Sequence, residues 1–276
     1  MGEIFDEIRE SIYGDMEFGR YKIEIVDDRE DSITVRQTST DGEMEYVFTN
    51  PDVINEQWIM DRISMTESAK NHIYDIDTEG TAAWINRFID PAMLASIDSI
   101  IFIGSPSEEL ETCNLNDDLV DMIQENFNGM TDSTGMTVGC DMIFINTQGV
   151  VQKVINDMDN DIKNPSVFID AVNRELAVTV AHEFMHVAQH NPYFPFGRLD
   201  DEYLCGNEEW EAEDFGQKTG AEGNPNMLRN DEQTRKAVWD MTVENYSLHG
   251  QHGTPTYESD SPDRSYSVYD HDEYEL

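Results

Sequence analysis

The chain has few basic residues. Its 276 residues include 17 Lys and Arg against 58 Asp and Glu, which gives a formal net charge of −41 at pH 7. Only six of the basic residues are lysines, and the acidic excess extends along the whole sequence. Such a surface repels nucleic acids and anionic membranes, because both carry dense negative charge. We therefore expect neither nucleic-acid nor membrane partners.

The same charge carries information about the surrounding medium. At low salt, like charges repel one another and destabilise a compact protein. At molar salt the Debye length falls to about 3 Å and the repulsion is screened. An evenly acidic, lysine-poor composition therefore indicates salt-rich surroundings, as in a halophilic archaeon or one of its viruses. We expect a cytoplasmic or virion-associated protein, with a virion or another protein assembly as a candidate partner.

Cysteines and long apolar runs are also scarce. Cys113, Cys140 and Cys205 are widely spaced and form no CxxC pair, which argues against a disulfide framework or a zinc knuckle. No apolar run approaches the length of a membrane helix, and the acidic amino terminus does not resemble a signal peptide. The chain contains no Gly-rich phosphate loop, GxSxG elbow or kinase signature. A mechanism with a serine or cysteine nucleophile has no local support.

The most informative motif present is His182-Glu183-Phe184-Met185-His186, an HExxH sequence. Residues four apart lie on one face of an α-helix, so the two imidazoles can bind the same metal ion. The intervening glutamate can reach a metal-bound water and accept its proton. Imidazole suits Zn²⁺, and a catalytic zinc site usually has three protein ligands. The motif predicts two zinc ligands, His182 and His186, and a catalytic base, Glu183.

The residues around the motif support a helix over 167–190. Asn164 is a suitable N-cap and Pro165 a suitable first helical residue. Apolar residues recur at three- and four-residue spacing between Leu176 and Ala188, so one broad face is predicted to be buried. Pro192 ends the helix and also excludes the metzincin pattern, which requires a third histidine at that position.

The motif and the segment after it resemble the gluzincins, zinc peptidases with two His ligands and one Glu ligand. Residues 182–189 (HEFMHVAQ) resemble the HExxHxxQ helix of small bacterial gluzincin domains. Residues 211–216 (EAEDFG) resemble the EAxxFA signature of the ImmA/IrrE-type metallopeptidases. The resemblance covers roughly residues 165–220. It implies a zincin-like fold, peptide or protein substrates, and a third zinc ligand on a second helix.

The resemblance makes Glu211 the expected third ligand, because the gluzincin ligand Glu is commonly followed by Ala, here Ala212. Glu208 shares a helix face with Glu211 and is the main alternative, while Glu209 and Glu213 compete for the same role. Some gluzincins carry an Asp four residues after the ligand, where it orients a zinc-bound His. This chain has Phe215 at that position, with Asp214 as the nearest acid.

The pattern along the chain predicts an α+β fold. After a short amino-terminal helix, three alternating segments separated by Asp-rich turns predict an antiparallel β meander. Apolar runs predict buried strands before the HExxH helix, consistent with a zincin-like domain that has a small mixed sheet. The expected strands are 21–26, 32–38, 43–49, 97–104 and 139–146, and further helices are expected at 53–72, 81–88, 115–128 and 231–245.

These elements suggest three regions. Residues 1–50 hold the helix and the meander, residues 51–248 form the zincin-like domain, and residues 249–276 form an acidic, disordered tail. Tyr203, Tyr193 and His249 are further candidates for donating a hydrogen bond to a developing oxyanion.

The predicted function is zinc-dependent peptide hydrolysis with Glu183 as the general base. The alternative is a non-catalytic structural or interaction protein, such as a viral particle component, that retains a metallopeptidase fold. An intact Glu183 favours catalysis, because metal binding alone does not require it.

Overall fold

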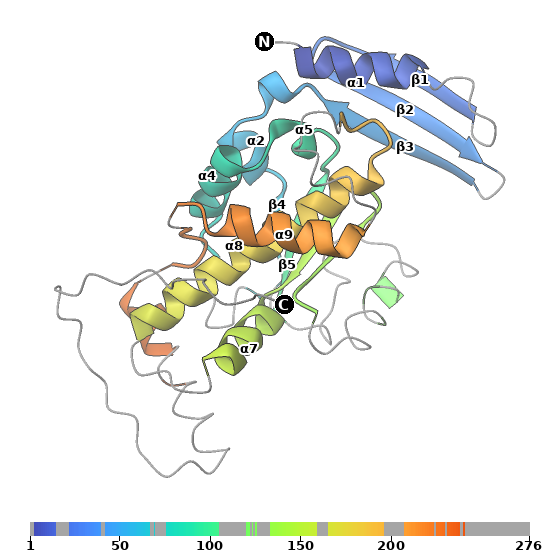
Figure 1. Cartoon of the computed structure of the whole chain (residues 1–276). Helices are drawn as coiled ribbons and strands as arrows, with labels where there is room; N and C mark the ends of the chain where they lie inside the picture. Colours follow the sequence, from blue (N-terminus) through green and yellow to red (C-terminus); the bar gives the residue numbers. More distant parts are fainter. Residues whose placement is uncertain are drawn as a thin grey trace, which may run out of the picture.

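The computed structural model describes residues 3–14, 22–39, 42–66, 69, 76–104, 120, 121, 123, 125, 133–158, 165–195, 207–223, 225–229, 231–237 and 240. Over these residues the chain has an α+β architecture with one antiparallel sheet and one mixed sheet (Figure 1). The predicted fold class is confirmed at this level. The predicted tail at 249–276 and most of the helix expected at 115–128 lie outside the described residues.

A three-stranded antiparallel sheet covered by a helix forms the amino-terminal part, confirming the predicted meander. The strands lie in the order β1-β2-β3. Helix α1 lies along one face of the sheet (Figure 1) and buries its apolar residues against alternate residues of β2 and β3. This period of two is what a half-buried strand requires. The bounds are α1 Glu3–Gly14, β1 Lys22–Asp28, β2 Ser32–Ser39 and β3 Gly42–Thr49.

The second sheet has four strands in the order β4-β5-β7-β6. The first three are parallel, whereas β6 pairs antiparallel with β7 at the edge of the sheet. Strands β5 and β7 are nearly continuous apolar runs, as expected for strands buried on both faces. The bounds are β4 Ile63–Met65, β5 Ser99–Ile103, β6 Gly135–Val138 and β7 Met142–Asn146.

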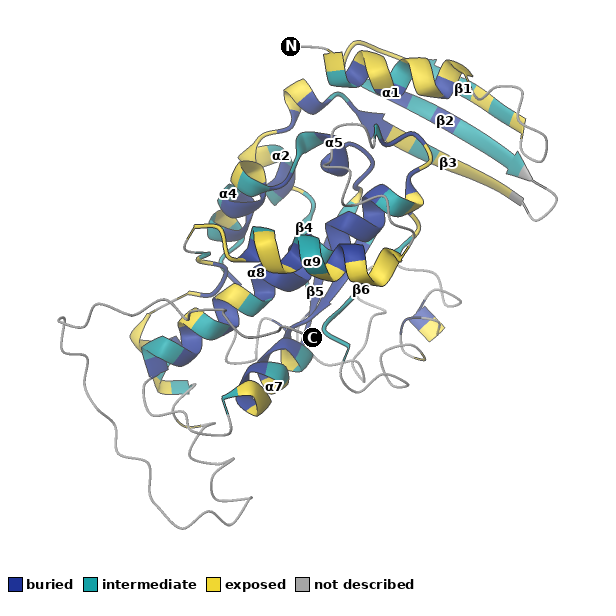
Figure 2. Cartoon of the chain, viewed as in Figure 1, coloured by how far each residue is buried: buried dark blue, intermediate teal, exposed yellow. Residues whose placement is uncertain are grey.

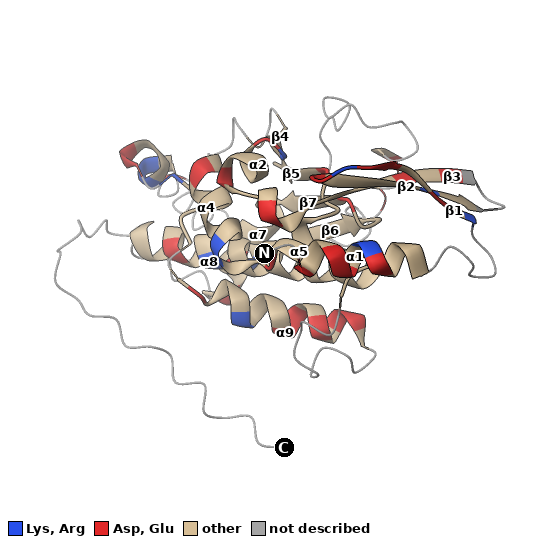
Figure 3. Cartoon of the chain, turned by 90° about the horizontal axis from the view of Figure 1, so that it is seen from above, with Lys and Arg blue, Asp and Glu red and all other residues tan. Residues whose placement is uncertain are grey.

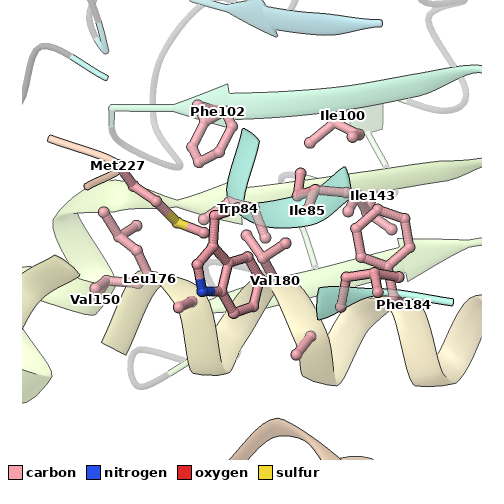
Figure 4. Packing of buried hydrophobic residues seen from close by; sticks show 14 of the residues in the cluster. Trp84, Ile85, Ile100, Phe102, Ile143, Val150, Leu176, Val180, Phe184 and Met227 are labelled. Atoms are coloured by element: carbon pink, nitrogen blue, oxygen red, sulfur yellow. The ribbon is translucent and has the colours of Figure 1, made fainter. Parts of the chain in front are cut away.

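Helices pack against this sheet and enclose the main hydrophobic core. Leu176, Val180 and Phe184 lie on the side of α8 that faces the sheet, and Phe184 lies beside Ile143 of β7 (Figure 4). The buried residues of α8 and of the central strands form one continuous interior (Figure 2). The bounds are η1 Pro51–Val53, α2 Glu56–Met60, α4 Thr78–Phe88, α5 Pro91–Leu94, α7 Thr147–Asp157, α8 Pro165–His190 and α9 Glu208–Gly220.

The single helix expected over 53–72 is wrong. The structure has a five-residue helix there, α2, which begins after the N-cap Asn55 and is followed by the short strand β4. Ile63 of β4 pairs with Ile100 of β5, so the backbone hydrogen bonds of this segment come from a neighbour distant in sequence. Three residues are too few to show a periodic pattern, and tertiary pairing decided their conformation.

The long helix predicted around the HExxH motif is confirmed as α8, which spans 26 residues. Pro165 is its first residue, as predicted, while Asn164 lies outside the described residues. Within the described part of the chain, no helix combines the length and apolar character needed to cross a membrane.

Candidate metal and catalytic centre

The two histidines of the motif converge on one point. His182 and His186 lie one turn apart on α8, and their Nε2 atoms are 3.0 Å apart. Their rings meet edge to face with centroids 4.7 Å apart. Two imidazole nitrogens directed at the same position form half of a zinc ligand set.

Helix α9 lies across α8 at this point because two of its residues have no side chain. A Cβ on Gly216 would meet the carbonyl oxygen of Val178 at 2.9 Å and Cβ of His182 at 3.2 Å. A Cβ on Gly220 would meet Cα and N of Val178 at 2.7 Å. Larger residues would hold the helices further apart. The two glycines therefore allow the first turns of α9 to approach the histidines (Figure 1).

The acids of α9 that face the histidines are Glu209 and Glu213. Glu209 has Oε2 3.7 Å from Nε2 of His182 and Oε1 3.6 Å from Nε2 of His186. Glu213, one turn later, has Oε2 3.6 Å from Nδ1 of His182. The ligand atoms of His182, His186 and Glu209 all lie within 4.8 Å of one another. These three residues form a group that can hold a metal ion.

Glu211, the predicted third ligand, points in a different direction. It is buried, and its Oε2 accepts a hydrogen bond from Nε2 of Gln189 at 3.2 Å. Oε1 of Gln189 lies 2.7 Å from Nδ1 of His186. Glu211 is thus linked through Gln189 to Nδ1 of His186, the ring nitrogen outside the candidate metal group. Glu209 instead lies beside the imidazole Nε2 atoms. Glu208, the alternative ligand, is also outside the group that can hold a metal.

The predicted base, Glu183, is buried between α8 and the edge strand β6. It is 4% exposed, and Oε2 lies 2.7 Å from the hydroxyl of Thr137. A Cβ on Gly135 would meet Cγ and Cδ of Glu183 at 2.8 and 2.9 Å, so the glutamate packs directly over the strand backbone. Burial raises the pKa of Glu183 to about 8, although the hydrogen bond from Thr137 opposes the rise. In the metal-free protein the carboxyl group can therefore hold a proton near neutral pH, and a cation bound nearby would favour its ionised form.

Burial favours neutral imidazole at His182. Burial lowers the pKa of His182, and His186 lowers it further, while Glu209 and Glu213 act in the opposite direction. A metal ion binds the neutral form of imidazole, so this environment is compatible with a ligand.

A cleft of about 470 Å³ opens over these groups, within the usual range for small-molecule sites. Strand β6 forms one wall and the first half of α9 another, where acidic residues gather (Figure 3). Lys153 of α7 is the one Lys or Arg in the described lining, and it forms an ion pair with Glu175 of α8. Burial lowers the pKa of Lys153, but Glu175, together with the charges of Glu213 and Asp157, offsets this and raises it overall. The described cleft is predominantly acidic.

The predicted oxyanion donors are not found at the cleft in the described residues. Tyr193 is 2% exposed and packs edge to face on Phe48 at 5.5 Å in the amino-terminal core. Tyr203 and His249 lie outside the described residues. His190, which the sequence did not single out, lines the cleft with Nδ1 3.0 Å from the carbonyl oxygen of Gly139.

Sequence reasoning also missed the contributions of β6 and the orientation of α9. Gly135 and Thr137 belong to a strand of four residues, too short to give a periodic signal. Glu209 and Glu213 are four residues apart, and this spacing could have marked them as one helix face. The nearby Glu211-Ala212 pair matched the family pattern and drew the assignment instead.

The chain was compared with models of known protein families, with curated proteins and with solved structures, and none of the three comparisons gave a match.

Proposed function

We propose that this chain is a zinc-dependent peptidase with a zincin-like fold, in which His182, His186 and Glu209 hold the metal and Glu183 is the general base. The proposal is carried by the convergence of the Nε2 atoms of His182 and His186 with the carboxylate of Glu209. The buried Glu183 lies on the same turn of α8 as the histidines. Two imidazoles and one carboxylate, with a fourth position left for water, are the ligand set of several catalytic zinc sites.

When bound, zinc supplies a Lewis acid that polarises a substrate carbonyl and lowers the pKa of a water molecule. The remaining steps belong to the protein's own residues. Glu183 accepts a proton from the attacking water and donates it to the nitrogen of the breaking peptide bond, so that the amine leaves neutral. Thr137 holds the carboxyl group in place during both transfers.

Assigning Glu209 as the third ligand also accounts for a departure from the family pattern. Some gluzincins carry an acid four residues after the ligand, but Glu211 has Phe215 at that position. Four residues after Glu209 stands Glu213, whose carboxylate lies 3.6 Å from Nδ1 of His182. A small movement of the carboxylate would bring it within hydrogen-bond distance of Nδ1, where an acceptor fixes the imidazole orientation and strengthens metal binding. Phe215, in contrast, packs against the hydrophobic core.

The edge strand suggests how a peptide would be presented. In the described sheet, β6 is the last strand, and it passes directly over Glu183. An extended peptide can add to such an edge through main-chain hydrogen bonds. This would bring a peptide bond alongside the base, and it supports peptide or protein substrates.

Metal analysis and one substitution test the proposal. The purified protein should contain about one zinc per chain, and His182→Ala, His186→Ala and Glu209→Gln should each lose it. Glu183→Gln should retain zinc but reduce cleavage of a peptide library by about 10²–10⁴-fold, because an amide cannot accept the proton. The exposed Glu56 provides a matched control, and Glu56→Gln should behave like the parent.

Protein never exposed to chelator that contains no transition metal would refute the metal site. Zinc binding without cleavage of any peptide would instead favour a structural or interaction protein that keeps the fold. Undiminished cleavage by Glu183→Gln would refute Glu183 as the general base. The two results separate metal binding from catalysis.

A further inference from the structure

The side-chain amide of Gln189 joins the two helices of the site. Its Nε2 donates to the backbone carbonyl oxygen of Glu208 at 3.0 Å and to Oε2 of Glu211 at 3.2 Å. Its Oε1 lies 2.7 Å from Nδ1 of His186. One end of the amide therefore contacts α9, and the other contacts a histidine of the candidate metal group.

Hydrogen-bond chemistry determines which way the amide of Gln189 faces. A backbone carbonyl and a carboxylate are acceptors, so the amide nitrogen must face Glu208 and Glu211. The reverse orientation would place the amide oxygen against two other oxygens. Oε1 of Gln189 therefore faces His186, and because an amide oxygen only accepts, Nδ1 of His186 must carry the hydrogen.

The tautomer of His186 determines which nitrogen can bind a metal. A neutral imidazole protonated at Nδ1 has its lone pair on Nε2. In this structure Nε2 of His186 is the atom 3.0 Å from Nε2 of His182 and 3.6 Å from Glu209. The hydrogen-bond chain that begins at Glu211 thus leaves the lone pair of His186 directed at the candidate metal position.

The burial of Glu211 is consistent with this role. Glu208 and Glu209 in the same helix turn are exposed, whereas Glu211 is 4% exposed. A buried carboxylate is costly unless hydrogen bonds compensate it. The first turn of α9 favours a negative charge, and a charged acceptor holds an N–H donor more strongly than a neutral one. Glu211 can therefore prevent rotation of the amide.

We propose that Glu211 is a positioning residue, which holds the amide of Gln189 so that His186 keeps the Nδ1–H tautomer and presents Nε2 to the metal. The metal part of this inference rests on the proposed function, whereas the tautomer belongs to the protein without metal. Glu211 therefore supports a ligand without being one.

The first test measures the tautomer in metal-free protein. Long-range ¹H–¹⁵N NMR of histidine-labelled protein, with His186 assigned by substitution, should show the Nδ1–H form. Glu211→Leu should shift His186 toward a mixture of tautomers. Glu211→Gln keeps an acceptor oxygen and should preserve the parent form. An unchanged tautomer in Glu211→Leu would overturn the proposal, whether or not the protein binds zinc.

The second test measures zinc affinity by competition with a chelator at constant salt. Glu211→Leu and Gln189→Leu should each weaken binding about 10–100-fold, the usual cost of losing an outer partner of a ligand. The double variant should bind zinc no more weakly than the weaker single variant, because each substitution breaks the same chain of hydrogen bonds. Glu211→Gln should restore most of the affinity, and Glu222→Gln, an exposed control, should match the parent.

The outcomes separate the two proposals. Additive losses in the double variant would overturn the hydrogen-bond chain. Loss of zinc by Glu211→Gln, together with retention by Glu209→Gln, would make Glu211 a ligand and also overturn it. If the parent binds no zinc, the proposed function fails, and the tautomer measurement alone decides the role of Glu211.

Discussion

The hydroxyl oxygen of Thr137 lies 2.7 Å from Oε2 of Glu183 and 3.0 Å from the backbone carbonyl oxygen of the same residue. One hydroxyl hydrogen cannot serve both acceptors at once. When Glu183 is ionised, the hydroxyl donates to the carboxylate. When Glu183 is protonated, its acid O–H can donate to Thr137, and the hydroxyl is free to donate to the carbonyl. Thr137 therefore has a hydrogen bond for both states of the proposed base.

Replacing this hydroxyl should slow hydrolysis. A hydrogen bond to a charged group contributes about 1.5–3 kcal/mol, so Thr137→Val should lower kcat by roughly 10–100-fold. Thr137→Ser keeps the hydroxyl and should retain most of the activity. Steady-state kinetics with one peptide substrate give the comparison. A Thr137→Val enzyme as fast as the parent would mean that this contact does not support the base.

Gly135→Ala should displace the base without unfolding the protein. The added Cβ would lie 2.8 Å from Cγ of Glu183 and 2.9 Å from its Cδ, so the glutamate side chain must move. Zinc content should be unchanged, while kcat falls at least tenfold, because proton transfer needs hydrogen-bond distance. Gly14→Ala adds the same methyl group where no atom lies within 4 Å, and it should be neutral. Equal activity of the two variants would contradict the role of Gly135.

The stability of the metal-free protein should reveal the burial of Glu183. Its pKa rises to about 8 in the folded state from an ordinary value of 4.5. Between these pH values the folded protein keeps the proton that the unfolded chain releases, so the free energy of unfolding falls as pH rises. The fall amounts to at most about 1.4 kcal/mol per pH unit for one group.

Glu183→Gln removes this titration. The melting temperature of the variant minus that of the parent should therefore increase from pH 5 to pH 8, measured with chelator and at constant high salt. Other groups titrate in both proteins and cancel in the difference. A difference that stays constant with pH would show that Glu183 is not protonated in the folded state.

Gly220→Ala should separate the two helices of the site. The new Cβ would lie 2.7 Å from Cα and N of Val178, backbone atoms that cannot move without shifting α8. Overpacking of this kind costs about 1–3 kcal/mol. It should also weaken zinc binding, because Glu209 and Glu213 depend on the close approach of α9. Calorimetry and chelator competition should both detect the change, whereas Gly14→Ala should alter neither.

The sequence predicted the parts of the site that depend on local geometry. His182, Glu183 and His186 follow from the helical repeat, and the structure places them on α8 as expected. The choice between Glu209 and Glu211 depends on the rotation of α9 relative to α8. That rotation is set by Gly216 and Gly220 against Val178, a contact between distant segments that no local pattern reveals.

The same distinction, between features set by local patterns and features set by distant contacts, applies to the fold. The alternating strands of the meander were predicted because their period is repeated over seven or eight residues. Strands β4 and β6 have three and four residues, and they exist because neighbours supply their hydrogen bonds. The two short strands become visible only once the sheet is assembled. Helix α7 was missed for a different reason, because its buried residues Val150, Val151, Val154 and Ile155 do recur at helical spacing and were not recognised.

The acidic surface should make folding dependent on salt. A net charge of −41 with 17 basic residues leaves many carboxylates within one Debye length of each other at low salt, about 30 Å at 0.01 M. Their repulsion destabilises the compact state more than the expanded chain. Cations bound by clusters of carboxylates in the folded protein would add to the effect by mass action.

We therefore expect the melting temperature to rise steeply between 0.1 M and 3 M KCl. Each 1 kcal/mol of repulsion relieved corresponds to about 2–4 °C for a protein of this size. KCl is the appropriate probe, because sulfate and sucrose stabilise most proteins by exclusion from their surface. A melting temperature that does not change with KCl would show that the acidic composition is not an adaptation to salt. The proposed metal site would survive that result, since it depends on the geometry of α8 and α9, but the inferred halophilic source would not.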